Sequence, residues 1–235
     1  MAMLKPAPWG TILDRRLSFP LEAAQYNTAT LVFDVPFAAA RALVPGAFEP
    51  VRTGPGLAQF VITASDYRRT DWGSCHQLCF AFLARPAGPG QEVPGLLVHR
   101  SPVDDAFTCA VGHGVMSYPV TIELIEVGYT PDRVTFDLAV GVQPALTLSL
   151  PRGTAKGPVE QLGLTVYSLR EGVPHRMPMR TDHTPVLDPG ADPVEITLGS
   201  GPLAQELRGL GLPRQPSWWS WGEDLTATFQ AGGPV

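Results

Sequence analysis

The stretch that decides the fold runs from Asp104 to Glu126 and reads DDAFTCAVGHGVMSYPVTIELIE. It opens with a short, acid-led apolar segment that predicts a helix, and it passes two glycines before it reaches Tyr118 and Pro119. Pro119 fixes its own backbone angle φ and favours an extended conformation at Tyr118. The stretch then leaves as a strand of alternating character over residues 120–126. We therefore expect a helix-to-strand turn that holds side chains at the mouth of a barrel or cleft.

The rest of the sequence predicts many short strands and few helices. Segments that alternate or are rich in β-branched residues, bounded by glycine and proline, are typical of strands. The predicted strands cover residues 28–35, 57–65, 74–83, 96–100, 133–140, 145–150, 162–169, 194–198 and 223–230. Helices are predicted over residues 36–43 and 202–210, a charged turn over residues 66–73, and an irregular lead-in over residues 1–20. No repeat or linker stands out. We therefore expect one domain over residues 1–235, of the α+β class, with mostly antiparallel strands curled into a barrel or cone.

The composition argues against several classes of function. The net charge is −5 and no cluster of Lys and Arg appears, which argues against nucleic-acid binding. No apolar run of about 18 residues occurs, so no membrane span is expected, and the first residues lack an apolar signal core, which predicts a cytoplasmic protein. Cys75, Cys79 and Cys109 are expected to be free thiols, because the nearby His76 does not complete a four-ligand zinc site. We expect neither a metal nor a cofactor.

Residues Ala110 to Pro119, in which Ala-Val-Gly is followed after five residues by Tyr-Pro, resemble the core segment of the acetoacetate decarboxylases. In that family two lysines follow the Tyr-Pro or Phe-Pro pair; the first forms a Schiff base with the keto acid, and the second lowers the pKa of the first. This chain has Val120 and Thr121 at those places. Residues 43–50, LVPGAFEP, also resemble the N-terminal part of the family.

The resemblance covers roughly residues 25–230 and implies a cone-shaped β-barrel with helices packed outside, an active site inside the barrel, and a homo-oligomer. It also implies further replacements in the site. The family's carboxylate-binding arginine falls near Tyr26, and its two glutamates fall on Val61 and Gln77. Neutral residues thus replace all the charged groups, as expected if they changed together, because a buried unpaired charge costs several kcal/mol. The site is then either a structural relic or a site rebuilt for a neutral or hydrophobic substrate.

Four residues are candidates for chemistry. Tyr118, Gln77 and Thr121 offer a phenol, an amide and a hydroxyl that can orient a carbonyl group or stabilise an enolate. Glu123 shares a strand face with Thr121 and can act as an acid or base if it is buried. The alternatives are packing for Tyr118, a hydrogen bond to neighbouring backbone for Gln77, and an outward, solvated position for Glu123.

Substrate contacts are expected from residues near the turn and from the positions that the resemblance implies. These residues are Tyr26, Val61, Val120, His113, Met116 and Arg176. His113 is instead a surface or capping residue if it faces outward, and Arg176, a candidate receptor for a carboxylate, is otherwise part of a solvated loop. If Val61 faces inward, strand alternation places Thr63 and Ser65 inward as well.

The sequence leads to one main hypothesis of function and two alternatives. The main hypothesis is a lysine-independent enzyme of the acetoacetate decarboxylase-like superfamily that acts on a small or medium organic substrate with carbonyl or hydroxyl groups, in specialised metabolism. Cyclisation, dehydration, aldol-type chemistry and isomerisation fit acid–base groups and orientation alone. The first alternative is a non-catalytic protein that binds a small molecule in the same cavity. The second is a decarboxylase that uses Lys156, which, with Lys5, is one of the two lysines of the chain.

Overall fold

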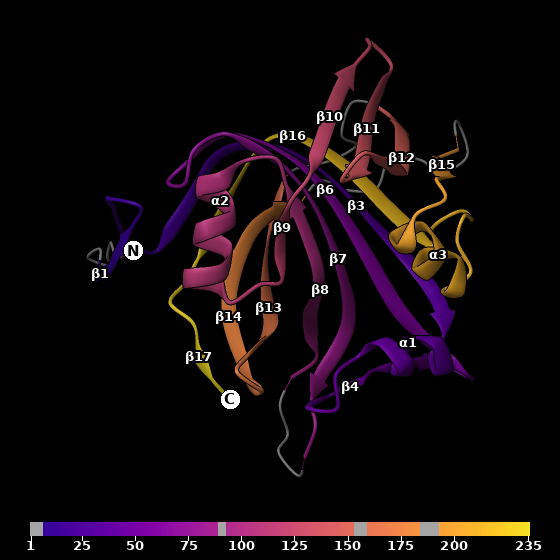
Figure 1. Cartoon of the computed structure of the whole chain (residues 1–235), viewed down its shortest axis with the longest axis horizontal. Helices are drawn as coiled ribbons and strands as arrows, with labels where there is room; N and C mark the ends of the chain where they lie inside the picture. The colour runs from indigo at the N-terminus through magenta and orange to yellow at the C-terminus, as the bar shows by residue number, and fades with distance from the viewer. Residues whose placement is uncertain (1–6, 89–92, 153–158, 184–192) are drawn as a thin grey trace.

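Seven strands close into a barrel in the computed structural model, which describes residues 7–88, 93–152, 159–183 and 193–235. Around the barrel the order is β7, β6, β3, β16, β14, β13 and β8, and β8 pairs with β7 again (Figure 1). Their bounds are β3 (Leu21–Pro36), β6 (Leu57–Thr70), β7 (Cys75–Pro86), β8 (Gly95–Val103), β13 (Glu160–Arg170), β14 (Val173–His183) and β16 (Trp218–Phe229). Neighbours are antiparallel except β8 and β13, which run parallel. The expected mostly antiparallel α+β barrel is confirmed.

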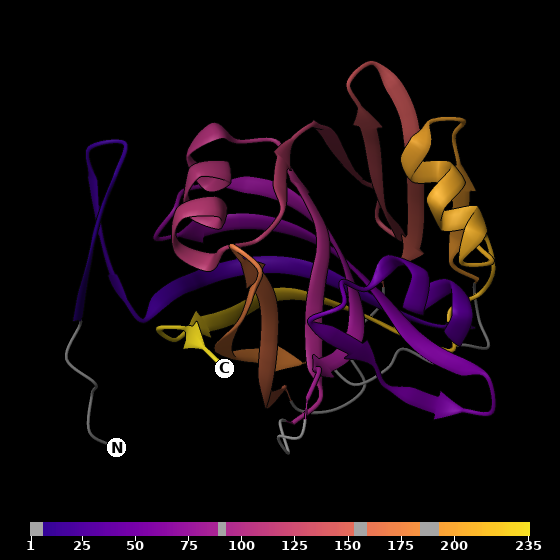
Figure 2. The same cartoon turned by 60° about the horizontal axis from the view of Figure 1, so that its bottom comes forward.

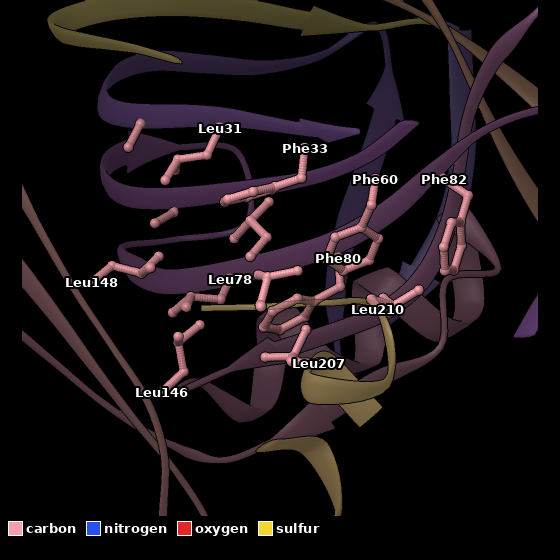
Figure 3. Close-up of a cluster of buried hydrophobic side chains, with 14 of the residues drawn as sticks. Leu31, Phe33, Phe60, Leu78, Phe80, Phe82, Leu146, Leu148, Leu207 and Leu210 are labelled. Atoms are coloured by element: carbon pink, nitrogen blue, oxygen red, sulfur yellow. The ribbon is translucent and has the colours of Figure 1, made fainter. Parts of the chain in front are cut away.

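A second layer covers one outer face of the barrel. It is a sheet of four strands with α3 (Pro202–Gly209) beside it (Figure 1). The strands are β10 (Leu124–Tyr129), β11 (Arg133–Val140), β12 (Gln143–Pro151) and β15 (Glu195–Leu198). Figure 3 shows how leucine and phenylalanine side chains of β3, β6 and β7 meet leucines of β12 and α3. The largest hydrophobic core therefore lies outside the barrel, between the two layers.

The alternation of β3 explains why the barrel has an apolar outside and a more polar inside. Leu31 and Phe33 are fully buried in the core between the layers. Thr30 and Val32, which alternate with them, point to the other face and into the barrel. Because the outer sheet covers the apolar face, the inward face is free to carry hydroxyl groups.

The stretch from Asp104 to Glu126 forms the expected helix and turn, but the strand expected over residues 120–126 is divided at Glu123 into β9 (Val120–Ile122), which pairs with β8, and β10, which belongs to the outer sheet. The helix α2 (Ala106–Val111) begins at Asp105, whose Oδ2 accepts a hydrogen bond of 2.7 Å from the backbone N–H of Thr108. A π-helical turn, η1 (Gly112–Met116), follows and ends at Ser117. Ser117 adopts a left-handed conformation with a φ of 57°, and the chain then enters β9.

The remaining elements are short. They are α1 (Phe37–Leu43), β4 (Phe48–Pro50), β5 (Arg52–Gly54) and β17 (Gly233–Pro234). β4 and β5 extend the barrel sheet beside β7 and β6, and β17 pairs with β14. Within the described residues, no helix is long and apolar enough to cross a membrane.

Two local expectations were wrong. The lead-in is not irregular throughout, because β1 (Ala7–Ile12) and β2 (Arg15–Phe19) form a hairpin that stands beside the barrel (Figure 2). Leu17 and Phe19 of β2 are buried in a hydrophobic cluster, and this packing stabilises the hairpin although prolines are frequent in the first 20 residues. The charged turn is shorter than expected, because β6 continues to Thr70 and pairs there with β3.

Candidate functional site

The barrel encloses a cavity of about 600 Å³. This volume lies in the range of pockets that hold small organic molecules. The wall consists of inward-facing side chains of the barrel strands, α2, η1 and the segment before β9. Two exposed lining residues, Val93 and Leu162, mark the mouth next to the place where β8 and β13 pair at two positions.

Strand register sorts most of the wall into rows. Residues paired across antiparallel strands point to the same side of a sheet, so paired residues of β16, β3, β6 and β7 form rows across the wall. Along the strands the rows are Leu225, Tyr26, Tyr67 and Cys75; Gly222, Thr28, Ser65 and Gln77; Ser220, Thr30, Thr63 and Cys79; and Trp218, Val32, Val61 and Ala81. All of these residues except Cys75 line the cavity. We call the two middle rows the Gln77 row and the Cys79 row; both are polar and lie between an aromatic row and an apolar row.

Tyr118 brings a phenol into the cavity from the turn between η1 and β9. Its backbone N–H donates to Gly112 O at 3.0 Å, which fixes the turn. The side chain is 6% exposed and donates to the sulfur of Met177 at 3.8 Å. A thioether is a weak acceptor, so this phenol has unused capacity to donate. Burial, with a smaller effect of Cys79, raises the pKa of Tyr118, and the group is therefore neutral at physiological pH.

Gln77 presents a carboxamide to the same cavity. Its Nε2 donates to the hydroxyl of the fully buried Ser101 at 2.7 Å. The carboxamide is thereby oriented, and no described residue donates a hydrogen bond to its Oε1. Gln77 is in register with Val103, which packs in one cluster with Tyr118. The amide and the phenol therefore belong to the same part of the wall.

The aromatic row carries phenols that already have partners. The Tyr26 hydroxyl is hydrogen-bonded to Thr181, and its ring stacks on Tyr67 at 5.3 Å between centroids. Burial raises the pKa of Tyr26 to about 12, and burial also raises the pKa of Tyr67. These phenols therefore remain protonated and act as neutral hydrogen-bonding groups.

The thiol of Cys79 is also neutral. Burial raises the pKa of Cys79 to about 12, although a hydrogen bond with Thr63 works in the opposite direction. A protonated thiol is a weak nucleophile. Cys79 thus acts as a small, soft part of the wall.

Six of the ten residues selected from the sequence line the cavity. They are Tyr118, Gln77, Tyr26, Val61, Val120 and Met116. The predicted inward direction of Thr63 and Ser65 also agrees with the structure. What these residues do chemically stays a prediction.

Thr121 and Glu123 do not reach the cavity. Val120 is buried and faces inward, so strand alternation turns Thr121 outward, where it is exposed. Glu123 is half-buried and accepts a hydrogen bond of 2.8 Å from the backbone N–H of Gly141, at the turn after β11. Glu123 therefore supports a turn of the outer sheet.

His113 and Arg176 lie outside the cavity as well. His113 is exposed on η1 and lines a separate recess of about 430 Å³ on the outside of the barrel. Arg176 is exposed on β14, and the next residue, Met177, is the buried partner of Tyr118. Arg176 thus points away from this phenol.

Thr30 and Ser220 also line the cavity, although neither was among the site residues expected from the sequence. The signal for Thr30 was present, because Thr28, Thr30 and Val32 alternate with large apolar residues in TATLVFDV. Ser220 lies between Trp219 and Trp221, and this aromatic segment gives no alternation of polar and apolar residues from which an inward serine could be predicted. Trp219 and Trp221 belong to the core, whereas Trp218 lines the cavity.

The described lining contains one group with a formal charge. This group is Asp182, whose Oδ2 accepts hydrogen bonds from the backbone N–H and the hydroxyl of Thr226, at 2.9 and 2.8 Å. Neither Lys, Arg nor His appears among the described lining residues. Within the same part of the chain, His, Cys, Asp and Glu form no group of three that fits a metal ion. Lys156 lies outside the described residues.

Two ionic clusters stabilise the barrel from outside the cavity. His76 Nδ1 lies 2.6 Å from Asp104 Oδ2, which links β7 to the segment before α2. The hydrogen bond with Asp104 raises the pKa of His76. On the other side, Glu206 of α3 binds Arg100 and His99 of β8 at 2.7 and 2.9 Å. Burial raises the pKa of Glu206, but these two partners outweigh it and bring the value down to about 2.

Two glycines allow close approaches next to the site. A Cβ on Gly112 would lie 2.4 Å from the side chain of Val120. A Cβ on Gly95 would lie 2.4 Å from the backbone oxygen of Thr165. The turn therefore packs directly on β9, and β8 packs directly on β13 beside the mouth.

Solved structures share this architecture at low sequence identity. An acetoacetate decarboxylase from Legionella pneumophila is 13% identical, with a TM-score of 0.66, over 94% of this chain and 90% of that chain. An acetoacetate decarboxylase-like enzyme from Sphingomonas wittichii RW1 is 12% identical, with a TM-score of 0.59, over 96% and 97%. MppR, an enduracididine biosynthesis enzyme complexed with the condensation product of pyruvate and imidazole 4-carboxaldehyde, is 15% identical, with a TM-score of 0.56, over 97% of each chain.

No family model matches the sequence, and no curated protein matches it either. The structural likeness nevertheless extends over nearly the whole chain and agrees with the resemblance of residues 110–119. The chain therefore has the acetoacetate decarboxylase-like fold.

Proposed function

We propose that the protein is a lysine-independent enzyme that binds a small or medium neutral organic molecule with carbonyl or hydroxyl groups inside the barrel. The observation that carries this proposal is the phenol of Tyr118, which is buried in the cavity wall and has a thioether as its described partner. A buried donor without a strong acceptor gains most from a ligand oxygen. The substrate oxygen is therefore assigned to a position next to Tyr118.

The chemistry of the wall favours reactions that need orientation and hydrogen bonding. Tyr118 donates to a carbonyl oxygen and stabilises negative charge that develops there, as an oxyanion-hole donor does. Gln77 Oε1 accepts from a substrate hydroxyl and holds the molecule in register with the phenol. Cyclisation, dehydration, aldol-type bond formation and isomerisation all build charge on a carbonyl oxygen or move a proton next to one. MppR, which shares the fold, is complexed with the condensation product of pyruvate and imidazole 4-carboxaldehyde, and this supports a carbonyl compound as the ligand here.

One observation favours the alternative of a non-catalytic binding protein. Asp182 is the carboxylate of the described lining, and hydrogen bonds from Thr226 already occupy one of its oxygens. The neutral wall suits binding without turnover equally well. The two functions differ in whether removing the Tyr118 hydroxyl affects rate or only affinity.

The test compares Tyr118→Phe with the unmodified protein on a panel of keto compounds and hydroxyl compounds. Binding is measured by native mass spectrometry and turnover by product analysis. For an enzyme, Tyr118→Phe lowers kcat by about 10²-fold or more, as removal of an oxyanion-hole donor does, while binding is largely kept. For a binding protein, no compound is consumed and Tyr118→Phe weakens binding alone. The control is Tyr129→Phe, which removes a phenol that does not line the cavity.

The decarboxylase alternative needs a Schiff base on Lys156. Borohydride reduction in the presence of acetoacetate, followed by peptide mass spectrometry, detects such an adduct. An adduct at Lys156 would support this alternative, and its absence from a protein that consumes the substrate would exclude it.

The setting of the protein is part of the same proposal. We place it in the cytoplasm, in specialised metabolism, as a homo-oligomer of a one-domain chain. Size-exclusion chromatography with light scattering measures the subunit number, and a monomer at all concentrations would contradict the oligomer.

A further inference from the structure

The polar wall of the cavity divides into groups that already have hydrogen bonds and groups that do not. Within the Gln77 row, the hydroxyls of Thr28 and Ser65 lie 2.9 Å apart and bind each other. Within the Cys79 row, Thr63 interacts with the thiol of Cys79. Two of these four groups, Ser65 and Thr63, lie on β6, and the other two lie on its neighbours β3 and β7. The free capacity lies on both sides of them.

The first free set consists of Ser220 on β16 and Thr30 on β3, which we call the hydroxyl pair. The two residues are paired across neighbouring strands and both line the cavity. Ser220 is 5% exposed. Neither hydroxyl has a hydrogen-bond partner among the described residues. Both hydroxyls are therefore available to hydrogen-bond a ligand or water in the cavity.

The second free set consists of Gln77 Oε1 and the phenol of Tyr118, which we call the amide–phenol pair. Gln77 lines the cavity and is held by Ser101 through Nε2, and no described residue donates to its Oε1. Tyr118 has the weak sulfur acceptor described above. This set offers one strong acceptor and one strong donor.

The two sets are separated by a fixed distance. Thr30 lies on β3 and Gln77 on β7, and β6 lies between these strands. Thr30 is in register with Cys79, two residues from Gln77, so two strand spacings of about 4.8 Å and two residues of about 3.4 Å along the strand give a separation of about 12 Å along the wall. The lining also includes the apolar side chains of Met116, Met179, Val98 and Val166. A polar group in the middle of a ligand would meet hydroxyls of the Gln77 row that are already bonded to each other.

We propose that the cavity takes a neutral molecule with two oxygen functions, hydroxyl or carbonyl, about 12 Å apart and joined by an apolar span. One oxygen binds the hydroxyl pair and the other binds the amide–phenol pair. This inference rests on the proposed function and adds the second contact point and the spacing. The reactive carbonyl lies at Tyr118, and the second oxygen positions the substrate.

The test uses linear α,ω-diols with four, six, eight and ten carbons, each compared with the 1-alkanol of the same length. Kd is measured by tryptophan fluorescence, because Trp72 and Trp218 line the cavity. The ratio of the two Kd values isolates the second oxygen, since the hydrocarbon contribution is common to both. We expect the diol to bind about 2- to 10-fold more tightly near the eight-carbon length, where its ends span the two sets, and no such advantage at four carbons.

Variants assign the two contact points. The double variant Thr30→Val/Ser220→Ala removes the hydroxyl pair with little change in shape, and it should abolish the advantage of 1,8-octanediol over 1-octanol. Thr121→Val is the control, because this threonine is exposed outside the cavity, and it should leave the ratio unchanged.

The outcomes separate this inference from the function on which it rests. If 1-octanol and octanediol bind equally at every length, or if the double variant keeps the diol advantage, the two-point inference is wrong while the cavity remains a binding site. If neither series binds, both the inference and the proposed function are refuted.

Discussion

Placing a lysine at position 120 tests how this cavity differs from a Schiff-base site. By the resemblance to the acetoacetate decarboxylases, Val120 falls at the place of their nucleophilic lysine; it is 4% exposed and lines the cavity. The cavity of about 600 Å³ has room for the longer side chain. The resemblance puts Val61 and Gln77, both neutral, where those enzymes have glutamates, and the carboxylate of the described lining, Asp182, already accepts hydrogen bonds from Thr226. The amine in Val120→Lys would therefore be desolvated with little compensation.

The magnitude follows from burial. A buried lysine without a partner loses about 3 pKa units from its usual value of about 10.4, which gives a pKa of about 7.4. The cost at neutral pH is about 4 kcal/mol of unfolding free energy, at 1.36 kcal/mol per unit. Because the unfolded chain binds the proton more tightly, the variant gains stability as the pH rises from about 7 to about 10. At pH 8 most of the amine would be neutral and nucleophilic.

Urea unfolding at several pH values measures the pH dependence of stability. Borohydride trapping with acetoacetate, followed by intact mass spectrometry, detects the nucleophilic amine. Thr121→Lys is the matched control, since this position is exposed: it should keep its stability and form no specific adduct. If Val120→Lys forms no more adduct than Thr121→Lys, position 120 does not face a keto-acid site. If its stability is independent of pH, the reasoning from desolvation is refuted.

Three further predictions concern stability. Gly95→Ala should lower the unfolding free energy by about 1–3 kcal/mol, because its Cβ would lie 2.4 Å from the backbone oxygen of Thr165; urea unfolding measures this. His76 has a pKa raised above 6.5 by its hydrogen bond with Asp104. Its contribution to stability is therefore complete below pH 6.5 and is lost as the pH rises through the raised pKa, and His76→Gln should flatten this part of the thermal stability profile. Glu206, whose pKa is lowered to about 2, contributes stability above pH 4.5 that is lost as the pH falls towards 2; Glu206→Gln should reduce this acid dependence in circular dichroism titrations.

Each of the three has a control or a contradicting result. Gly163→Ala on β13 adds the same methyl group with no heavy atom within 4 Å, and a loss equal to that of Gly95→Ala would contradict the steric argument. A pH profile that is unchanged in His76→Gln would mean that the link to the segment before α2 carries no net energy. Unaltered acid unfolding in Glu206→Gln would show the same for the contact between α3 and β8.

The sequence predicted the turn at Ala110 to Pro119 because local backbone preferences determine it. A proline after Tyr118 ends the helical segment in any context, and the apolar alternation of residues 28–35 requires one buried face. The inward positions of Val61 and Gln77 followed from the resemblance together with the two-residue period of a strand. These features need no knowledge of distant contacts.

The structure alone decided which polar groups meet in the cavity. Thr121 and Glu123 are only one and three residues beyond Val120 in the chain, yet neither lines the cavity: Thr121 is exposed, and Glu123 accepts a hydrogen bond from Gly141 in a turn of the outer sheet. The hairpin of the first 20 residues forms because Leu17 and Phe19 are buried against partners far along the chain.

The spacing between the two sets of free hydrogen-bonding groups is also a tertiary property. Ser220 lies beside Thr30 only because β16 pairs with β3, although the two residues are far apart in the sequence. Strand alternation specifies which way each side chain points, but the order of strands around the barrel specifies its neighbours. The polarity of the cavity can therefore be predicted from the sequence, whereas the shape of the ligand that fits the cavity depends on the pairing of distant strands.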